Sequence, residues 1–453
     1  MHNPIYTPDQ IREAEQPLIQ KLGEGLMRRA AFAVAVEAWQ LLPPGHRRVL
    51  VLAGSGNNGG DALYAAAELE KRGAVIEVWQ LGERIHPAIT AIKYPRMVTG
   101  VNDPDLIIDG IVGIGARGPL TGAAKEAAEQ SHGHAVVSVD IPSGVDPLTG
   151  MAEGASISAD VTVTFGGLKP AHILGWERCG RVVLKDIGIT MGKAWGYAAG
   201  IGSWPEPGPN DHKYTHGVVG IHAGSSQYPG AAVLCVQAAV RATSSMVRYI
   251  GPCVQQVLAA QPEVVAAPGR CDAWVIGPGV GETDMLGQLI DQDIPLVIDA
   301  DSLTQLANQP GLKDKIRQRK ALTVLTPHDG EFERLTGRKP FDRVRDAQAL
   351  AEDLGCVVLL KGRVTVITDG TEIYLVEAGS SWAATPGSGD VLAGIIGKAV
   401  AWEASISAVA SAARLHALAA GWGNTPKIAG DIVRAIPKVR TTMFTHGLAH
   451  HHN

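Results

Sequence analysis

Strand-like and helix-like segments alternate along almost the whole chain, and this alternation limits the possible fold more than any other feature. Short runs of β-branched residues follow helical patterns repeatedly, with glycine-rich turns between them. Because neighbouring parallel strands need a crossover between them, this order favours parallel sheets covered by helices on both faces. At 453 residues the chain exceeds one typical hydrophobic core, so we expect an α/β protein of two domains.

The expected elements fall into two groups. In the first half, strands are expected at Arg48–Ala53, Val75–Gln80, Leu106–Asp109, Ala135–Asp140, Val161–Phe165 and Arg181–Leu184, and helices at Glu24–Leu42, Gly60–Arg72 and Ala123–Ser131. In the second half, strands are expected at Val218–Ala223, Ala273–Ile276, Leu296–Asp299, Leu322–Leu325, Val357–Leu360, Thr365–Thr368 and Ile373–Val376. Helices are expected there at Ala231–Tyr249, Ser302–Leu306, Asp329–Thr336, Arg343–Leu354, Asp390–Trp402 and Ile406–Gly421.

A proline-rich break separates the two groups. Residues 205–211 contain three prolines and no large apolar side chain, which is typical of a linker. We therefore expect one domain at 1–204 and another at 212–440. Residues 441–453 carry several histidines, and we expect them to form a disordered tail rather than a metal site.

Composition narrows the classes of partner. A formal net charge of −5 gives no electrostatic reason to bind nucleic acid or an anionic membrane surface. The five cysteines are dispersed, which fits reduced thiols in a cytosol better than a disulfide framework. The apolar run Ala30–Leu42 is too short to span a bilayer and contains Glu37. We therefore expect a cytoplasmic protein with neither a nucleic-acid nor a membrane partner.

A glycine-rich loop at Gly54–Asp61 follows the first expected strand and opens a helix. Its glycine spacing misses the full dinucleotide fingerprint, so an ordinary Rossmann dinucleotide site is weakly indicated. Three side-chain oxygens stand in the loop instead, on Asn57, Asn58 and Asp61.

Two later strand ends add polar side chains to the same expected edge. Asp109 ends one strand, and Asp140 with Ser143 follows the next. Side-chain oxygens that converge at one sheet edge suit a hard cation and a ligand site. The alternative, that these residues only cap turns and helices, holds for each motif taken alone.

The most informative turn of the second half is Gly387-Ser388-Gly389-Asp390. Its glycines allow backbone N–H groups to converge, and the apolar run behind it reads as a buried helix. A helix N-terminus attracts phosphate. Asp390, in the first turn, is placed to remove a proton from an attacking hydroxyl. This arrangement suits phosphoryl transfer from a nucleotide to an alcohol.

Four further loops follow strands in this half, at Gly224–Ala231, Gly277–Gly281, Thr326–Glu333 and Lys361–Thr365. Taken alone, His328 would be a helix-start residue and Lys361 a solvated strand-end lysine. Asp299 and Asp301 could cap a helix, or they could face a substrate or Mg²⁺. More strand ends carry such loops than turn chemistry alone requires, and together the loops indicate a ligand site.

The motifs match a known family. The second half resembles the ribokinase-like superfamily and, within it, the ADP-dependent NAD(P)H-hydrate dehydratases. The resemblance rests on Gly-Ser-x-x-Tyr-x-Gly-Ala (224–231), Gly-Pro-Gly-x-Gly (277–281), Asp-Ala-Asp-x-Leu (299–303), Thr-Pro-His-x-Gly-Glu (326–331) and Gly-x-Gly-Asp (387–390). The first half, with Asn-Asn-Gly-Gly-Asp (57–61) and Val-Asp-Ile-Pro-Ser-Gly (139–144), resembles the NAD(P)H-hydrate epimerases.

The resemblance implies a fold and a function. It implies a Rossmann-like αβα sandwich for the epimerase domain and a ribokinase-like αβα sandwich for the dehydratase domain. Hydrated NADH or NADPH would be epimerised between its R and S forms by the first domain. The second would dehydrate the S form with ADP as cosubstrate, through transient phosphorylation. K⁺ in the first domain, Mg²⁺ in the second and a homo-oligomeric assembly are also implied.

The resemblance also implies site residues. Asp390 would be the base of the dehydratase, and Asp140 the acid/base residue of the epimerase. Substrate would contact Asn57, Asn58, Gly59, Gly60, Asp61, Gly113, Ile114, Gly115, Ala116, Arg117, Gly118 and Pro119 in the first domain, and Ala231, Gly279, Gly281, His328 and Asp390 in the second. The nucleotide would contact Lys361, Gly362, Arg363, Val364, Thr365, Gly387, Ser388 and Gly389. K⁺ would be held by Asn58, Asp109 and Ser143.

One departure from the family and two alternatives remain. Arg117 stands where a lysine is common, and because arginine almost never loses its proton, an acid/base role there is in doubt. A vitamin-precursor kinase of the ribokinase type, with a fused ligand-binding domain, would use the same Gly-x-Gly-Asp turn. The first half could also be a binding or oligomerisation module without catalysis.

Overall fold

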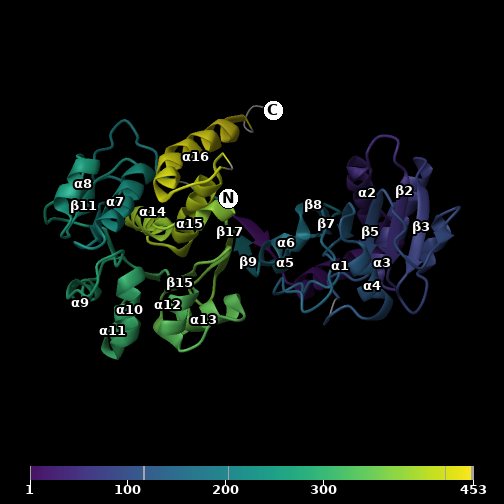
Figure 1. Cartoon of the computed structure of the whole chain (residues 1–453), viewed down its shortest axis with the longest axis horizontal. Coiled ribbons are helices and arrows are strands. Elements are labelled where there is room, and N and C mark those ends of the chain that lie inside the picture. Colours follow the sequence, from purple (N-terminus) through teal and green to yellow (C-terminus); the bar gives the residue numbers. More distant parts are fainter. Residues whose placement is uncertain (1, 116–117, 203, 424, 450–453) are drawn as a thin grey trace. The chain divides into compact units, whose positions relative to one another are not determined.

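The computed structural model describes residues 2–115, 118–202, 204–423 and 425–449. The chain divides into two compact units (Figure 1). The N-terminal unit is Pro4–Trp195, and the C-terminal unit is Met1–Asn3 with Gly196–Asn453. Each unit is built on one sheet with helices on both faces. The expected α/β architecture of two αβα sandwiches is therefore confirmed.

The sheet of the N-terminal unit has seven strands in the order β4-β3-β2-β5-β6-β7-β8, and all neighbours are parallel. The strands are β2 (Arg48–Ala53), β3 (Val75–Gln80), β4 (Arg96–Met97), β5 (Leu106–Gly110), β6 (Val136–Val139), β7 (Val161–Phe165) and β8 (Arg181–Lys185). The chain moves outward from β2 in one direction and from β5 in the other. In open α/β sheets, ligands bind beyond the strand ends at such a reversal.

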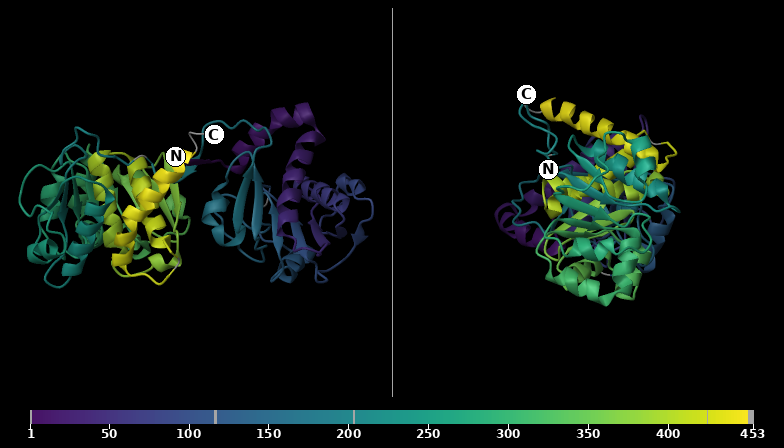
Figure 2. Two further views of the ribbon diagram at one scale, coloured as in Figure 1. Left: turned by 90° about the horizontal axis from the view of Figure 1, so that it is seen from above. Right: turned by 90° about the vertical axis from the view of Figure 1, so that its left-hand side faces the viewer.

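Helices cover both faces of this sheet. The helices of the unit are α1 (Pro8–Leu22), α2 (Glu24–Leu41), α3 (Asn57–Lys71), α4 (Gly122–Gln130), α5 (Pro170–Leu174) and α6 (Trp176–Cys179), with a 3-10 turn η1 (Pro87–Ala91). Helices α2 and α3 pack on each other and against the strands (Figure 2). Their apolar sides share one core with the strands. A second core, which includes Ala127 and Ala128 of α4, lies on the opposite face.

The sheet of the C-terminal unit has ten strands in the order β1-β9-β17-β16-β15-β14-β13-β12-β10-β11. They are β1 (Asn3–Ile5), β9 (Gly196–Ala198), β10 (Val219–His222), β11 (Val247–Tyr249), β12 (Ala273–Ile276), β13 (Leu296–Ile298), β14 (Thr323–Leu325), β15 (Val357–Leu360), β16 (Val364–Thr368) and β17 (Ile373–Glu377). Strands β10 to β15 form a parallel block, and β16 is antiparallel to both of its neighbours.

Two layers of helices enclose this sheet (Figure 1). One layer contains α7 (Pro229–Ala242), α14 (Ser388–Trp402), α15 (Ile406–Gly421) and α16 (Ala429–Ala449), and the other α10 (Ala300–Asn308), α11 (Pro310–Gln318), α12 (Asp329–Thr336) and α13 (Arg343–Leu354). The shorter elements are α8 (Val254–Ala260), α9 (Met285–Ile290) and η2 (Ser381–Ala383).

Helix α14 is buried in the middle of its layer. A side chain at Gly394 would overlap the carbonyl group of Cys235 on α7, and one at Gly397 would overlap Val275 of the sheet. These glycines allow α14 to approach both neighbours closely. Its N-terminus, which carries the Gly-x-Gly-Asp turn, is held in place by that packing.

One expected helix is wrong. Ala231–Tyr249 was expected as a single helix, but α7 ends at Ala242 and Val247–Tyr249 is strand β11. The β-branched Thr243 adopts extended backbone with φ −165° and ψ 160°. Its Oγ1 donates to the carbonyl of Pro205 at 3.2 Å, and β11 then pairs with β10. Pairing with the sheet therefore overrides the helical pattern.

The expected linker lies within the C-terminal unit, and the expected tail begins inside a helix. Residues 205–211 belong to the C-terminal unit, and Trp204 beside them is buried in its core. Helix α16 continues through 441–449, and residues 450–453 lie outside the described part of the chain. Among the described residues, no helix has the length and apolar character needed to cross a membrane.

Candidate functional site

The Gly-x-Gly-Asp turn forms the N-terminus of α14 in the C-terminal unit. The helix begins at Ser388, two residues before the expected start, so Gly389 and Asp390 lie in its first turn. Gly387 has φ +83°, and a side chain there would overlap Leu234. Only glycine fits both requirements. The turn therefore presents helix-terminal N–H groups as an anion site.

Asp390 has an environment suited to a base near neutral pH. Burial raises its pKa to about 6, and the nearby carboxylates of Asp299 and Asp301 act in the same direction. Lys361 opposes them and lowers the pKa of Asp390. A carboxylate with a pKa close to the working pH can both take and release a proton.

Lys361 connects the turn to two carboxylates. Its Nζ lies 2.8 Å from Asp299 Oδ1 and 3.6 Å from Glu331 Oε2. Burial alone would lower the pKa of Lys361, but the two carboxylates raise it overall. A side-chain carbon at Gly389 would stand 3.6 Å from Nζ, so the ammonium group lies beside the turn. Phosphate bound at the turn would therefore meet a fixed cation.

A cavity of about 670 Å³ opens beside this cluster. Of the predicted residues it is lined by His328, Lys361, Gly362, Arg363, Thr365, Ser388 and Gly389. The predicted nucleotide contact Val364 is instead a buried residue of β16. Most of the predicted nucleotide set thus shares one space that is large enough for a nucleotide.

The cavity also contains a residue that sequence reasoning missed. His416 of α15 lines it, and its Nε2 lies 3.2 Å from Ser388 Oγ. Burial lowers the pKa of His416 to about 4, so its ring is neutral near pH 7. Its helix gives no local signal of function. Glu331, in contrast, stands within the Thr-Pro-His-x-Gly-Glu motif.

The other predicted substrate contacts form a second cluster around Gly279. This residue has φ +63°, and a side-chain carbon there would lie 2.9 Å from Ala231 Cβ. The N–H of Gly281 donates to Asp301 Oδ2 at 2.9 Å. His328 has two roles, because its Nδ1 accepts from Gly330 N at 2.9 Å as a cap of α12 while it also lines the cavity.

In the N-terminal unit the glycine-rich loop packs tightly between β2 and β5. A side chain at Gly54 would overlap the carbonyl of Ile111, and one at Gly59 would overlap the carbonyl of Gly54. Helix α3 begins at Asn57, three residues before the expected start. Asn57 and Asn58 therefore stand in its first turn, at the reversal point of the sheet.

Of the residues expected to hold a cation, Asp109 and Ser143 are in contact, and Asn58 binds the neighbouring strand β6. Ser143 Oγ donates to Asp109 Oδ1 at 2.6 Å, and Ser143 N donates to Oδ2 at 2.9 Å. Asn58 Nδ2 donates to the Val139 carbonyl at 2.9 Å, and a carbon at Gly113 would stand 2.5 Å from Asn58 Oδ1. Burial raises the pKa of Asp109, although the hydrogen bonds from Ser143 oppose this.

Asp140 lies at the end of β6 in an ion pair with Lys169. The Lys169 Nζ is 2.6 Å from Asp140 Oδ1, and Thr164 Oγ1 donates to the same oxygen at 2.9 Å. Burial would raise the pKa of Asp140, but Lys169 lowers it overall. Lys169, which sequence reasoning missed, follows β7 in a Lys-Pro pair. Its position after a strand was the one available signal.

The loop predicted to contact substrate, Gly113–Pro119, is described in part. Ala116 and Arg117 lie outside the described residues. The carbonyl of Ile114 accepts a hydrogen bond from Arg12 at 2.6 Å. Around Gly115 and Gly118 there is open space on the side where a side chain would stand. The loop thus follows β5 on the same edge as Asn58.

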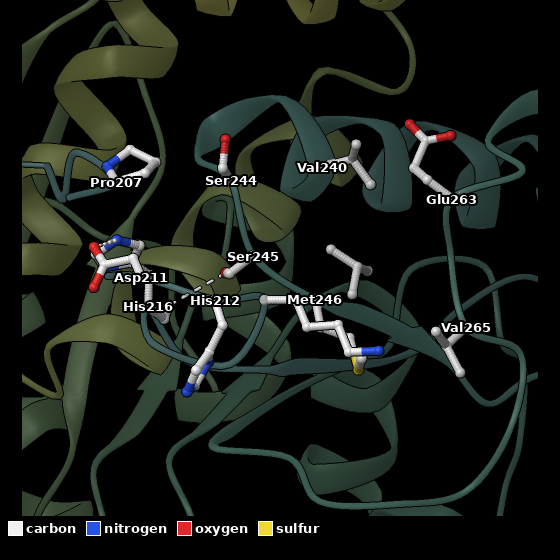
Figure 3. Close-up of a pocket in the computed structure, with 12 residues that line it drawn as sticks. Pro207, Asp211, His212, His216, Val240, Ser244, Ser245, Met246, Glu263 and Val265 are labelled. Atoms are coloured by element: carbon white, nitrogen blue, oxygen red, sulfur yellow. Dashed lines mark hydrogen bonds and ion pairs between the residues drawn. The ribbon is translucent and has the colours of Figure 1, made fainter. Parts of the chain in front are cut away.

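A separate hollow of about 440 Å³ lies in the C-terminal unit near the start of β10 and β11. Its lining includes Asp211, His212, His216, Ser245 and Glu263 (Figure 3). None of the predicted site residues is part of this lining. Within the described part of the chain, no group of three or more His, Cys, Asp or Glu side chains could hold a metal ion.

Comparisons with known proteins match each of the two units to a family. Residues 219–431 match the family model for NAD(P)H-hydrate dehydratase, and residues 23–171 match that for the YjeF-related protein N-terminus. Each match falls within one unit.

Several relatives share almost the full length. Proteins named bifunctional NAD(P)H-hydrate repair enzyme Nnr are 51% identical in Mycobacterium tuberculosis H37Rv (87% of this chain, 89% of the relative) and 46% in Mycobacterium leprae (97% and 98%). The Escherichia coli K12 relative is 31% identical, over 96% of this chain and 95% of its own. A solved Bacillus subtilis ADP/ATP-dependent NAD(P)H-hydrate dehydratase is 27% identical, with a TM-score of 0.47, over 53% of this chain and 94% of its own.

Proposed function

Because the chain belongs to the family of bifunctional NAD(P)H-hydrate repair enzymes, we propose that its two units perform two successive repair steps. The N-terminal unit interconverts the R and S hydrates of NADH and NADPH. The C-terminal unit converts the S hydrate back to the reduced cofactor, and ADP is its cosubstrate. The observation that carries this proposal is the placement of Lys361 and the glycine turn in the wall of one cavity of about 670 Å³, with Asp390 next to Gly389 of that wall.

The dehydration proceeds through a phosphorylated intermediate. Asp390 removes the proton from the hydrate's hydroxyl group as its oxygen attacks the β-phosphorus of ADP, and the bond to AMP breaks. The N–H groups of the turn and the Lys361 ammonium stabilise the charge on the transferring phosphoryl group. Phosphate, a better leaving group than hydroxide, then departs as a proton is lost from the neighbouring ring carbon, and the ring double bond is restored.

Mg²⁺ fits this site as a companion of the nucleotide. Asp299 Oδ2 would stand 3.9 Å from a carbon at Gly389, so it faces the turn, whereas Oδ1 is occupied by Lys361 and Thr326. Mg²⁺ is commonly held by one or two carboxylates together with substrate phosphates. Asp299 would hold the ion, which would neutralise phosphate charge.

K⁺ fits the cluster of Asn58, Asp109 and Ser143 in the N-terminal unit. The donors are all oxygen atoms, as a hard cation requires. Ser143 Oγ gives its proton to Asp109 and accepts from Val112 N at 3.0 Å, which leaves one of its two lone pairs for a cation. A bound K⁺ would favour the ionised form of the buried Asp109. It would also fix Asn58 in the helix start that we propose contacts the hydrate.

The test uses chemically hydrated NADH that contains both R and S forms. Incubation with the protein and ADP should restore the absorbance of NADH and release AMP and phosphate. The variant Asp390→Asn should not restore it. A kinase of the ribokinase type would leave phosphate on its product and form no NADH. Absence of recovery with both ADP and ATP would therefore contradict the proposed dehydration.

A further inference from the structure

A second carboxyl group lies close to Asp140 in the N-terminal unit and has not been given a role in catalysis. Asp61 is on α3, which packs against β6, and Asp140 directly follows β6. Asp61 Oδ1 is buried and has no hydrogen-bond partner among the described residues. A buried, unpaired carboxyl oxygen is costly, and such a group is found where a ligand or a proton completes it.

Lys169 forms a hydrogen bond with Asp140 but has no proton left for Asp61. Its three donor protons are all used, by Asp140 Oδ1 at 2.6 Å, Thr164 Oγ1 at 2.7 Å and the Phe165 carbonyl at 2.9 Å. No proton of Lys169 is left for Asp61. The lysine is 1% exposed, so water does not screen its pair with Asp140.

The backbone fixes this asymmetry. Asp140 has φ +67°, a left-handed conformation that is uncommon outside glycine. Its N–H donates to the Val163 carbonyl at 2.7 Å, and its carbonyl lies 2.8 Å from His172 Nε2. Because the N–H and the carbonyl of Asp140 are both fixed, its carboxylate is held against Lys169.

We propose that Asp61 is the general acid and Asp140 the general base of the epimerisation, and that Lys169 is the positioning residue that assigns these roles. The inference rests on the proposed epimerase function. The hydroxyl group of the hydrate stands on the carbon beside the ring nitrogen. Asp61 gives its proton to this hydroxyl, the C–O bond breaks, and the nitrogen lone pair forms a C=N bond as water leaves. Water then adds to the opposite face, and Asp140 takes its proton. One water leaves and one enters, and the proton taken up by Asp140 returns to Asp61 through water, so the step needs no other reactant and the pair is restored.

The pKa shifts of Asp61 and Asp140 agree with these roles of acid and base. Burial and the negative charges of Asp140 and Glu15 raise the pKa of Asp61 well above its usual range. Lys169 keeps the pKa of Asp140 below its usual range despite burial. The other charged or titratable groups are Glu15, whose pKa is raised mainly by burial, Arg12 beside it, and His172, whose pKa burial lowers to about 4. Two carboxyl groups with opposite shifts are a recognised sign of an acid/base pair.

The experiment measures R-to-S interconversion in the full chain against pH, without ADP. The wild type should lose activity at high pH, as Asp61 gives up its proton. Asp61→Asn should lower the rate on the order of 100-fold or more and abolish this alkaline limb. Asp140→Asn should also lower the rate. Lys169→Met should move the acid limb to higher pH, because the pKa of Asp140 rises without its cation, whereas Lys169→Arg should keep the limb near its wild-type position.

Controls separate the possible failures. Lys185→Met, in the same unit and paired with Glu37, should leave the pH profile unchanged. A wild-type rate for Asp61→Asn would overturn its role as the acid. A pH-independent loss in Lys169→Met, with the limb in place, would reduce Lys169 to a structural role. Thermal denaturation shows whether Lys169→Met is folded. If it is unfolded, the pH profile of Lys169→Arg decides the role of Lys169. A wild type no faster than spontaneous interconversion would instead contradict the epimerase function itself.

Discussion

At the scale of single residues, the chemistry of the C-terminal unit depends on how buried charges are arranged around Asp390. Asp299 and Asp301 raise its pKa, whereas Lys361 lowers it. Lys361 is in turn held by Asp299 and Glu331. The proposed base, the proposed phosphate-binding cation and the proposed metal ligand are therefore one electrostatic unit, and a change at one position alters the others.

The pH dependence of dehydration tests the role of Asp390. With a pKa of about 6, its carboxylate is mostly ionised at pH 7.5 and mostly protonated at pH 5. The base works only when ionised, so the dehydration rate should fall as pH decreases through about 6. The rate should be measured with S hydrate and saturating ADP. A flat profile between pH 5 and 8, or turnover in Asp390→Asn, would exclude Asp390 as the base.

Replacing Lys361 should affect nucleotide binding and the base together. Lys361→Met removes a charged donor to phosphate, which we expect to raise the KM for ADP roughly tenfold or more. It also removes the cation that lowers the pKa of Asp390, so the acid limb should move above about 6. Lys361→Arg keeps a positive charge and should leave the limb in place. An unchanged limb in Lys361→Met would show that the two groups are not coupled.

The predictability of the site also differs from residue to residue. Asp390, Lys361 and Asn58 could be found because each stands in a glycine-rich motif, which for Lys361 and Asn58 follows a strand directly. Lys169 and Asp140 are 29 residues apart, and their contact depends on the pairing of β6 with β7. His416 is inside a mostly apolar helix. Local patterns carry little information about such contacts, so Lys169 and His416 were not assigned from sequence.

At the scale of elements, strands were predicted more accurately than helix ends. Five strands, among them β2, β7 and β12, have the expected bounds because their β-branched runs are buried on both faces. Helix α1 was missed because it is mostly polar and contains Pro17. The end of α7 was wrong because pairing of β11 with the sheet decides it. The order of strands, which creates the reversal between β2 and β5, is a long-range property.

The close packing of α14 against α7 can be tested with one glycine. In Gly394→Ala the new carbon would overlap the Cys235 carbonyl, and we expect about 1–3 kcal/mol of destabilisation. The midpoint of thermal unfolding of this unit should fall by roughly 2–4 °C per kcal/mol. Gly287→Ala on α9 is the matched control. It has open space and should raise stability by about 0.5–1 kcal/mol. Equal melting of the two variants would show that the approach of α14 to α7 is not tight.

At the scale of the whole molecule, the two units share two structural features. In each, a glycine-rich turn starts a helix, at Asn57 and at Ser388. In each, a lysine pairs with a buried aspartate, Lys169 with Asp140 and Lys361 with Asp299. The two family models match one unit each. Each unit thus carries the candidate residues that we propose for its own reaction.

Separate sites predict separable losses in the full chain. With mixed R and S hydrates and ADP, the wild type should restore NADH completely in one course. Asp140→Asn should restore the S fraction at the normal rate and the R fraction only at the spontaneous rate of interconversion, which gives two phases. Asp390→Asn should equilibrate the two hydrates but form no NADH. An equal mixture of the two variants should again restore NADH completely, because the S hydrate made by one chain can diffuse to another.

A single fast phase in Asp140→Asn, with R hydrate consumed as in the wild type, would mean that Asp140 is not needed for epimerisation. Two phases that persist in the mixture would mean that the hydrate does not pass freely between chains.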